Sequence, residues 1–474
     1  MQRGEVNPES RDDFGQTPLS YAARGESEGI VKLLLRRGEV NPESRGNAGR
    51  TPLSYAAAYG TEGIVRLLLE REEVNLESRG NNGRTPLSYA AGSWSAGAVK
   101  ILLEREEVNP ESRDKDGRTP LSYAAEGWSQ GTNKLFLERE GVNPKSRDDC
   151  GSAPLSHTDE VESEETLKLL LEREEVNPES RDNYGRTPIS HAAKSGHEKI
   201  LKLLLEREEV NPASRDNDGR TPLAWAALHG REETVKLLLE RDEVNLESRD
   251  NLGRTLLFYS VASKSEPVLK LLLGRDTVDP ESRDNDGRTP LFHAVTYGTE
   301  EMVRLLLEKE EVNFESRDNA GWTPLFYAAA FRTKGIVKLL LERGNFNPES
   351  RDNSGQTLLS YVVQYGSEEA VRLILEREEI DPELRDNYGQ ASLSFAPGWR
   401  REIINLLRGR QRGNPESQDN SRGNYDRIPL FHCAEFGREG RLSCFWNEKR
   451  LIPNRGIVLA EHRSPARPDT AGKG

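Results

Sequence analysis

Hydrophobic residues recur along the chain in two kinds of short block, each spaced like the buried face of a helix. In the first kind, Leu87 is followed by Ala90 and Ala91, which form a narrow apolar stripe. In the second kind, residues 64–71 read Ile-Val-Arg-Leu-Leu-Leu-Glu-Arg, with a wide apolar face and a charged outer face. The pattern predicts two short helices per unit, near residues 86–93 and over residues 64–71, with counterparts along the chain.

Capping signals mark the ends of these helices. Thr85 stands before Pro86 as an N-cap followed by proline at the first helical position. A glycine that we expect to be left-handed ends the first helix in several units, at Gly60, Gly196, Gly230, Gly298 and Gly366. Ser or Thr then begins the second helix, and the polar residues 74–83 after it predict an extended finger.

One glycine of the finger recurs at a constant interval. It stands at positions 15, 49, 83, 117, 151, 185, 219, 253, 287, 321, 355 and 389, so every step is 34 residues. A period of this length is typical of stacked supersecondary units and not of a globule with one core. Since no unit can bury its Leu-Leu-Leu face alone, we expect neighbouring units to cover it.

The units resemble the ankyrin repeat family. One unit carries the whole pattern in residues 216–223 (Asp-Asn-Asp-Gly-Arg-Thr-Pro-Leu), 226–230 (Ala-Ala-Leu-His-Gly) and 235–239 (Val-Lys-Leu-Leu-Leu). The resemblance covers about residues 4–437, as about 13 units of which the last two are degenerate. It implies an all-α ankyrin-repeat solenoid with β-hairpin-like fingers. Long arrays of near-identical units such as this one resemble those of fungal ankyrin-repeat proteins.

The units also depart from the family pattern. Ser or Phe stands where the family has His after Thr-Pro-Leu. Pro-Glu-Ser is added after the second helix, which lengthens the finger and makes the period 34 instead of the 33 usual in the family. We expect the stacking of the units to be kept.

Two units are expected to form a weak part of the array. Asn133 replaces an aliphatic residue, Ala153 replaces the capping Thr, and Thr158 stands in place of the first paired alanine. A lost N-cap costs about 1 kcal/mol, and a buried polar group without a partner costs about 1–3 kcal/mol. We therefore predict the least stable junction between residues 125 and 165, which hydrogen exchange can test. Pro267 lies in the first turn of its helix, where proline is tolerated.

The two ends of the chain differ from the repeats between them. The first unit has no polar capping helix before it, so we expect that it frays or that the chain is part of a longer one. Residues 438–474 hold eight Lys/Arg, four Asp/Glu and three prolines. They are predicted to form a disordered basic tail, with a degenerate cap or a partner-docking segment as alternatives.

Composition and charge narrow the class of protein. The formal net charge is −13, from 67 basic and 80 acidic residues that are interspersed along the chain. A basic surface for binding nucleic acid is therefore not expected. Three cysteines cannot build a disulfide framework, which favours a reducing compartment. We expect no signal peptide, and we find no apolar run long enough to cross a membrane. We expect a cytoplasmic monomer, with the nucleus as a possible location.

No pattern in the sequence indicates catalysis. Four histidines, His157, His191, His293 and His432, occupy one repeat position where other units have Tyr, Trp or Phe, which favours packing. No Cys/His cluster has metal-ligand spacing, and no phosphate-binding glycine loop is found. We therefore expect no enzyme activity, no cofactor and no metal.

One repeat position predicts a contact surface. In ankyrin repeats the two positions after the paired alanines face the concave groove, and the second of them holds many aromatic residues here. The candidate groove residues are Tyr59, His229, Tyr297, Phe331, Tyr365, Trp399 and Phe436. Aromatic residues exposed in a row mark interfaces. The alternatives are that the rings shield the thin Ala-Ala contacts between units, or that they drifted during duplication.

The fingers add a second candidate set, on the groove side by the same resemblance: Arg50, Arg84, Arg118, Arg186, Arg220, Arg254 and Arg288. Finger acids could neutralise these arginines in part, and an acidic partner is the alternative. The sequence as a whole predicts a non-catalytic scaffold or adaptor that binds a partner protein through groove and fingers. Two alternatives remain: the chain is the recognition or regulatory array of a larger signalling or enzymatic protein, or it is a spacer without a partner.

Overall fold

The computed structural model describes residues 7–25, 27–93, 95–127, 129–158, 163–330, 334–343, 346–396 and 401–412. The chain divides into two units, Met1–Arg410 and Gln411–Gly474, and the description below concerns the first. The proposed tail at residues 438–474 lies outside the described residues.

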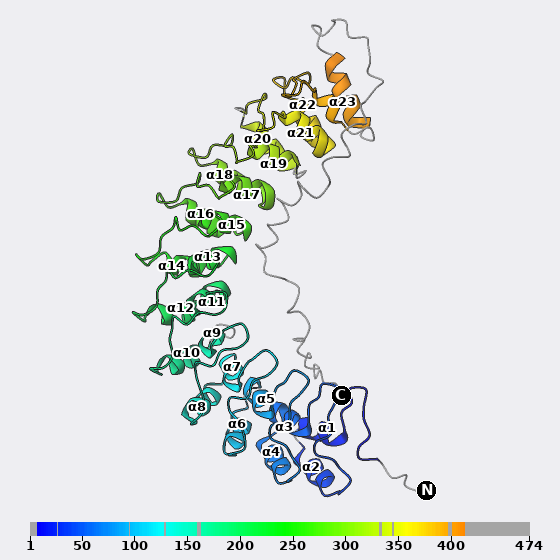
Figure 1. Ribbon diagram of the computed structural model, residues 1–474, viewed down its shortest axis with the longest axis vertical. Coiled ribbons are helices and arrows are strands. Elements are labelled where there is room, and N and C mark those ends of the chain that lie inside the picture. The colour runs from blue at the N-terminus through cyan, green and yellow to red at the C-terminus, as the bar shows by residue number, and fades with distance from the viewer. Residues whose placement is uncertain are drawn as a thin grey trace, which may run out of the picture. The chain divides into compact units, whose positions relative to one another are not determined.

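The structure is a row of helix pairs, one pair per repeat (Figure 1). The first helices of the pairs are α1 (Pro18–Arg24), α3 (Pro52–Tyr59), α5 (Pro86–Gly92), α7 (Pro120–Ala125), α9 (Pro154–His157), α11 (Pro188–Ser195), α13 (Pro222–Leu228), α15 (Leu256–Ala262), α17 (Pro290–Tyr297), α19 (Pro324–Ala330) and α21 (Leu358–Tyr365). The second helices are α2 (Glu28–Leu35), α4 (Glu62–Leu69), α6 (Ala96–Leu103), α8 (Gln130–Glu138), α10 (Glu164–Leu171), α12 (Glu198–Leu205), α14 (Glu232–Leu238), α16 (Glu266–Leu273), α18 (Glu300–Leu307), α20 (Lys334–Glu342) and α22 (Glu368–Leu375). A 3-10 turn, η2 (Ser392–Phe395), and helix α23 (Arg401–Arg412) follow.

The capping signals explain where the helices begin. The Thr85 hydroxyl accepts a hydrogen bond from the backbone N–H of Ser88, and Pro86 is the first helical residue of α5. Pro267 lies in the first turn of α16, as predicted. In the twelfth repeat the first helix is reduced to η2, and its N-cap position, Ala391, forms no side-chain cap.

The glycines after the first helices fall into two groups. Gly196 and Gly230 are left-handed, with φ of 83° and 65°, as the sequence predicted. The prediction is wrong for Gly60, Gly298 and Gly366, whose backbone is extended. At Gly60 the constraint is space, because an added Cβ would lie 2.7 Å from the carbonyl oxygen of Ala23 in the preceding repeat.

Neighbouring repeats share their cores. The Leu53, Ala56 and Ala57 side chains of α3 are fully buried, as are Ile64 and Leu68 of α4. Each first helix packs on the next first helix, and each second helix on the next second helix. Small alanine side chains let the first helices approach closely, so the apolar face of one repeat is removed from water by its neighbours.

The glycine that defines the period has a structural cause. It is left-handed at all twelve positions, with φ of 84° at Gly83. A Cβ at Gly83 would lie 2.7 Å from the backbone nitrogen of Lys115, in the next finger. Glycine is therefore required both by backbone conformation and by the close approach of consecutive fingers.

The added Pro-Glu-Ser segment supplies hydrogen bonds between repeats. The Glu43 carboxylate accepts from the backbone N–H of Asn75 at 3.0 Å and from the Ser78 hydroxyl. The arginine after this segment donates to two carbonyls: Arg79 Nη1 bonds to Gly83 O at 2.9 Å and to Arg113 O in the next repeat. The inter-repeat arginine bond recurs at each step from Arg11 to Arg385. The residues that lengthen the finger thus hold consecutive fingers together.

The structure changes the account of the predicted weak junction. Helix α9 has only four residues, and Ala153 forms no side-chain cap. Asn133, however, donates through Nδ2 to Ala124 O and to Thr166 Oγ1 in the next repeat, both at 2.9 Å. These bonds offset part of the cost of burying the amide. The missing cap and the short helix remain as the reasons to expect low stability there.

We predict that Ala153→Thr stabilises the array by about 1 kcal/mol, because it restores a capping hydroxyl like that of Thr119 in the preceding repeat. Urea unfolding and hydrogen exchange of residues 155–157 measure the effect. As the matched control, Thr119→Ala removes an intact cap and should destabilise by a similar amount. Equal exchange protection of residues 155–157 in Ala153→Thr and wild type would refute this account.

Candidate binding surface

Three candidate groove tyrosines lie at the last turn of their first helices, half exposed to solvent. Tyr59 ends α3, Tyr297 ends α17 and Tyr365 ends α21, with exposed fractions of 48%, 37% and 39%. His229 follows α13 and is partly buried, with its ring 5.7 Å from that of Trp225. Phe331, Trp399 and Phe436 lie outside the described residues.

The finger arginines pack on aromatic rings, in several cases those of the next repeat. The Arg84 guanidinium lies 3.8 Å from the centre of the Tyr123 ring, and Arg50 lies 4.4 Å from that of Tyr89. Arg288 has the same relation to Tyr327, at 5.5 Å. Such cation–π contacts are stabilising when they are partly desolvated, so these arginines help to join consecutive repeats.

Acidic residues of the fingers pair with the same arginines. Arg186 bonds to Asp182 at 2.7 Å, Arg84 lies 3.7 Å from Asp114, and Arg220 lies 3.3 Å from Asp218. Arg220 and Arg254 are buried. The finger acids thus neutralise these arginines in part, which is one of the two interpretations that the sequence left open.

The repeat position shared by histidines and aromatic residues has a common hydrogen-bonding role. In the seven repeats from Asp114 to Asp318, the finger aspartate accepts from backbone N–H through Oδ1, and its Oδ2 contacts the ring nine residues later. His191 Nε2 lies 3.1 Å from Asp182, Trp225 Nε1 donates to Asp216 at 3.0 Å, and the Tyr327 hydroxyl donates to Asp318 at 2.9 Å. In these repeats the position holds a ring that can hydrogen-bond to the aspartate, which packing alone does not explain.

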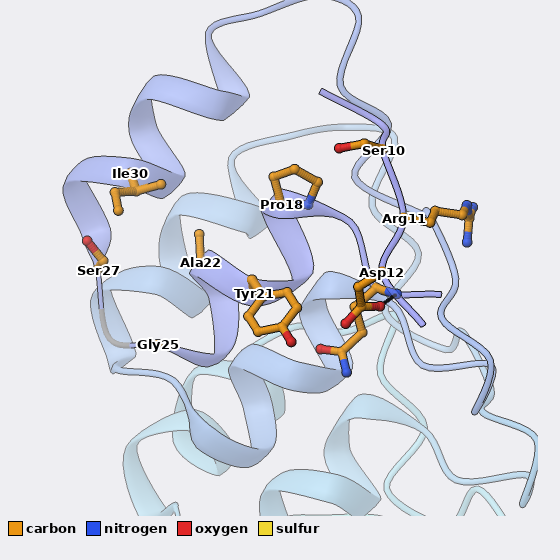
Figure 2. Close-up of a pocket in the computed structure, with 10 residues that line it drawn as sticks. Ser10, Arg11, Asp12, Pro18, Tyr21, Ala22, Gly25, Ser27 and Ile30 are labelled. Carbon is orange, nitrogen blue, oxygen red and sulfur yellow. Dashed lines mark hydrogen bonds between the residues drawn. The ribbon is translucent and has the colours of Figure 1, made fainter. Parts of the chain in front are cut away.

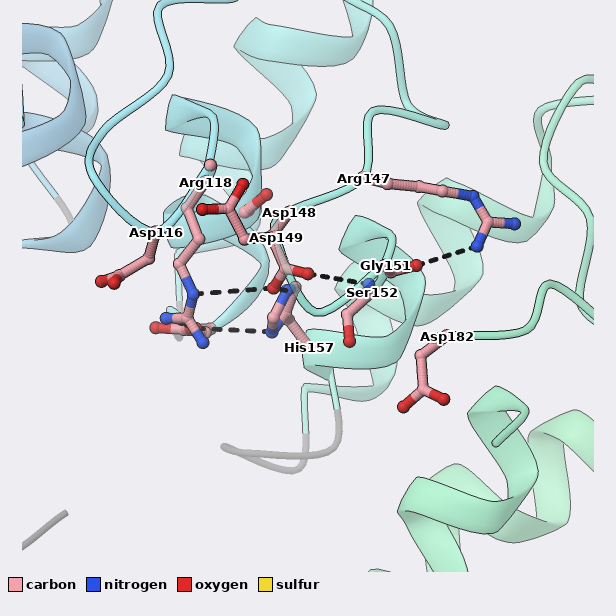
Figure 3. Close-up of polar contacts among 12 residues, drawn as sticks. Asp116, Arg118, Arg147, Asp148, Asp149, Gly151, Ser152, His157 and Asp182 are labelled. Atoms are coloured by element: carbon pink, nitrogen blue, oxygen red, sulfur yellow. Dashed lines mark hydrogen bonds and ion pairs between the residues drawn. The ribbon is translucent and has the colours of Figure 1, made fainter. Parts of the chain in front are cut away.

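His157 forms the most charged of these arrangements (Figure 3). Its Nε2 lies 3.3 Å from Asp148 Oδ2 and its Nδ1 lies 3.5 Å from Glu126, while Arg118 pairs with both carboxylates. Burial raises the pKa of Asp148, but the contact with His157 and the Ser152 backbone N–H outweigh it and lower the pKa overall. Since the same His–Asp pairing recurs at His191 and His293, we interpret this pair as structural.

A shallow hollow lies on the first described repeat (Figure 2). Pro18, Tyr21 and Ala22 of α1 and Ile30 of α2 supply its apolar wall. Tyr21 is 50% exposed, whereas its counterpart Tyr55 in the next repeat is 5% exposed because the preceding repeat covers it. The hollow is therefore the stacking face of a repeat and not a preformed reaction chamber.

The structure also reveals a set of exposed residues that the sequence reasoning missed. Four large apolar side chains stand at the tips of fingers, at Phe14, Tyr184, Leu252 and Tyr388, each directly before the periodic glycine. The signal was present in the sequence, because this position varies between repeats whose neighbouring positions are nearly constant.

The described residues hold no group of three or more His, Cys, Asp or Glu that could bind a metal. None of their helices is long and apolar enough to cross a membrane.

Stacked helix pairs joined by glycine-turned fingers define a repeat solenoid. A family model of three ankyrin repeats matches residues 2–79, 70–148, 128–216, 208–284, 263–352 and 335–419. The chain therefore belongs to the ankyrin repeat family. Among curated proteins, no significant match to the chain is found.

The ionisation of the Asp182 carboxyl predicts how acid changes the stability of the array. Its side chain is fully buried. Burial alone would raise its pKa, but hydrogen bonds from His191 and from the Arg186 backbone and side chain lower the pKa from 3.8 to about 2. A carboxyl with a lowered pKa stabilises the fold above its unfolded pKa, and this contribution is lost as the pH falls from about 4 to about 2.

We expect Asp182→Asn to destabilise the array at pH 7 by about 2 kcal/mol. The difference from wild type should shrink between pH 4 and pH 2, as measured by urea unfolding at each pH. Asp218→Asn, at an exposed finger carboxylate one repeat later, is the matched control and should have little effect. A difference between Asp182→Asn and wild type that stays constant over this pH range would contradict the assignment.

Proposed function

We propose that this chain is a non-catalytic scaffold or adaptor that holds a partner protein against the exposed ends of its first helices and its fingers. Ankyrin repeats are in general protein–protein interaction modules. The single observation that carries the proposal is the set of half-exposed tyrosines Tyr59, Tyr297 and Tyr365, which occupy the same position in different repeats. Tyrosines at such positions are frequent hot spots in interfaces.

The proposed contact residues form two sets. The groove set is Tyr59, His229, Tyr297, Phe331, Tyr365, Trp399 and Phe436. The finger set is Arg50, Arg84, Arg118, Arg186, Arg220, Arg254 and Arg288. Because several of these arginines stack on rings and pair with acids, we infer that the tyrosines contribute more affinity than the arginines. A typical partner face buries about 800 Å², which a few neighbouring repeats can supply.

The fingertips extend this surface. Tyr184 and Tyr388 are 59% and 78% exposed, so a partner in contact with the groove could also reach them. We infer that the protein acts in a reducing compartment, the cytoplasm or the nucleus, since Cys150 is a free thiol on a fingertip. We further propose that it acts as a monomer, without a cofactor.

The double variant Tyr297→Ala, Tyr365→Ala tests the proposal. We expect the captured partner proteins to be lost or reduced at least tenfold, because truncation of a hot-spot tyrosine commonly costs about 2 kcal/mol. Affinity capture with quantitative mass spectrometry measures the effect. The control variant Ile30→Ala, Leu33→Ala removes two side chains that are similarly exposed but lie on α2. Unchanged capture by the tyrosine variant, with its helical content intact, would rule out the groove as the contact surface.

A further inference from the structure

The chemistry of the groove changes along the array. In the repeats from Arg50 to Arg288, the residue after the periodic glycine is arginine in all but one. In the next three repeats this position holds Trp322, Gln356 and Gln390. We call Tyr297, Trp322, Gln356, Gln364 and Tyr365 the aromatic segment. All five residues are uncharged: Tyr297 and Tyr365 are half-exposed, Trp322 and Gln364 are partly exposed, and Gln356 is buried. The segment therefore offers rings, hydroxyls and one partly exposed amide in place of guanidinium groups.

The rings of the aromatic segment are held in place by their neighbours. The Trp322 ring lies 4.7 Å from that of Tyr361, which in turn lies 4.8 Å from Tyr365. The Trp322 indole donates to Asp352 at 3.2 Å, and Gln356 donates to Gln364 at 3.1 Å. Trp322 and Tyr361 are separated by 39 residues, the same separation as in the Arg50–Tyr89 and Arg84–Tyr123 contacts. Trp322 therefore takes over the stacking role of the arginine without its charge.

The spacing of the segment fits one kind of extended ligand. Packed helices lie about 8–10 Å apart, so equivalent positions such as Tyr297 and Tyr365, two repeats apart, are separated by roughly 16–20 Å. A polyproline II helix has three residues per turn and rises about 3.1 Å per residue, so one face recurs about every 9 Å. Every third ligand residue would then meet a new repeat. The side chains on one face of a β-strand recur about every 7 Å, which does not match the spacing of the repeats.

The hydrogen-bonding groups of the segment favour the same ligand. An amphipathic α-helix, whose side chains also recur after about 10 Å at every seventh residue, satisfies its own backbone groups. Its apolar face would bury the tyrosine hydroxyls without partners, which is costly. A polyproline II backbone has no internal hydrogen bonds, so its carbonyls can accept from the tyrosine hydroxyls and from the amide of Gln364.

We propose that the aromatic segment binds a proline-rich, uncharged segment of the partner protein, with proline at every third residue. Aromatic-lined grooves recognise such segments because the ligand is already ordered before binding. This inference rests on the proposed function, since it names the chemistry of a ligand for the same groove. The tyrosines and Trp322 contact the proline rings, and the Gln364 amide, whose orientation is set by the bond from the buried Gln356, donates to a backbone carbonyl of the ligand.

Fluorescence anisotropy with the full chain tests the proposal. The probe is a labelled 15-residue uncharged peptide with proline at every third position. We expect saturable binding that weakens at least tenfold in Tyr365→Ala and in Trp322→Arg. The second variant restores the arginine of the earlier repeats, so it keeps the fold. Leu33→Ala is the matched control: it removes an exposed apolar side chain on α2, in neither contact set, and binding should be unchanged.

Two further peptides separate the alternatives. A permuted peptide of the same composition but without the three-residue spacing should bind at least tenfold more weakly, and so should a helical peptide with leucine at every seventh position. Absence of binding by the proline-rich peptide, equal binding of the permuted peptide, or preferential binding of the helix would overturn the proposal. If partner capture still depends on Tyr297 and Tyr365 while the proline-rich peptide does not bind, the ligand class is wrong and the scaffold function stands.

Discussion

The structure depends on burial that is shared between neighbours. The described helix pairs share an apolar core that runs from one repeat to the next, and side chains such as Leu53 and Ile64 are fully buried in it, where adjacent repeats pack together. The alanine pairs allow this close approach. Stability in such an array is a sum of contributions from each repeat and each junction. A defect such as the four-residue helix α9 therefore lowers stability locally, at the junctions with its two neighbouring repeats.

Polar groups add order to this apolar contact. The Glu43-type carboxylates and Arg79-type guanidinium groups bond from one finger to the next, and the finger aspartates bind the rings of their own repeat. Most of the charged residues that could suggest chemistry are thus used to hold repeats together. His157, Asp148 and Arg118, which on their own look like part of a reactive site, follow the same repeated plan.

Local signals predicted the elements well, whereas contacts between repeats could not be derived from one unit. The Thr85-Pro86 start, the position of Pro267 and the 34-residue period each follow from local backbone chemistry, and the structure confirms them. The extended conformation of Gly60 could not be predicted, because its cause is a carbonyl of the preceding repeat. The hydrogen bond between Glu43 and Asn75 could not be predicted for the same reason, because the two residues are 32 positions apart and belong to different repeats.

Near-identical repeats make variation informative. Duplication copies the residues that stacking requires, so a position that changes while its stacking contact is kept is a candidate for another role. The change from Arg288 to Trp322 keeps the stacking contact with the next repeat and removes the charge. The stability of the junction does not demand this change, since Arg50 and Arg84 form the same contact elsewhere. The physical difference between the two residues is charge, since Arg288 carries a guanidinium group and Trp322 an uncharged indole. Under the proposed function, recognition is the property on which the two parts of the array differ.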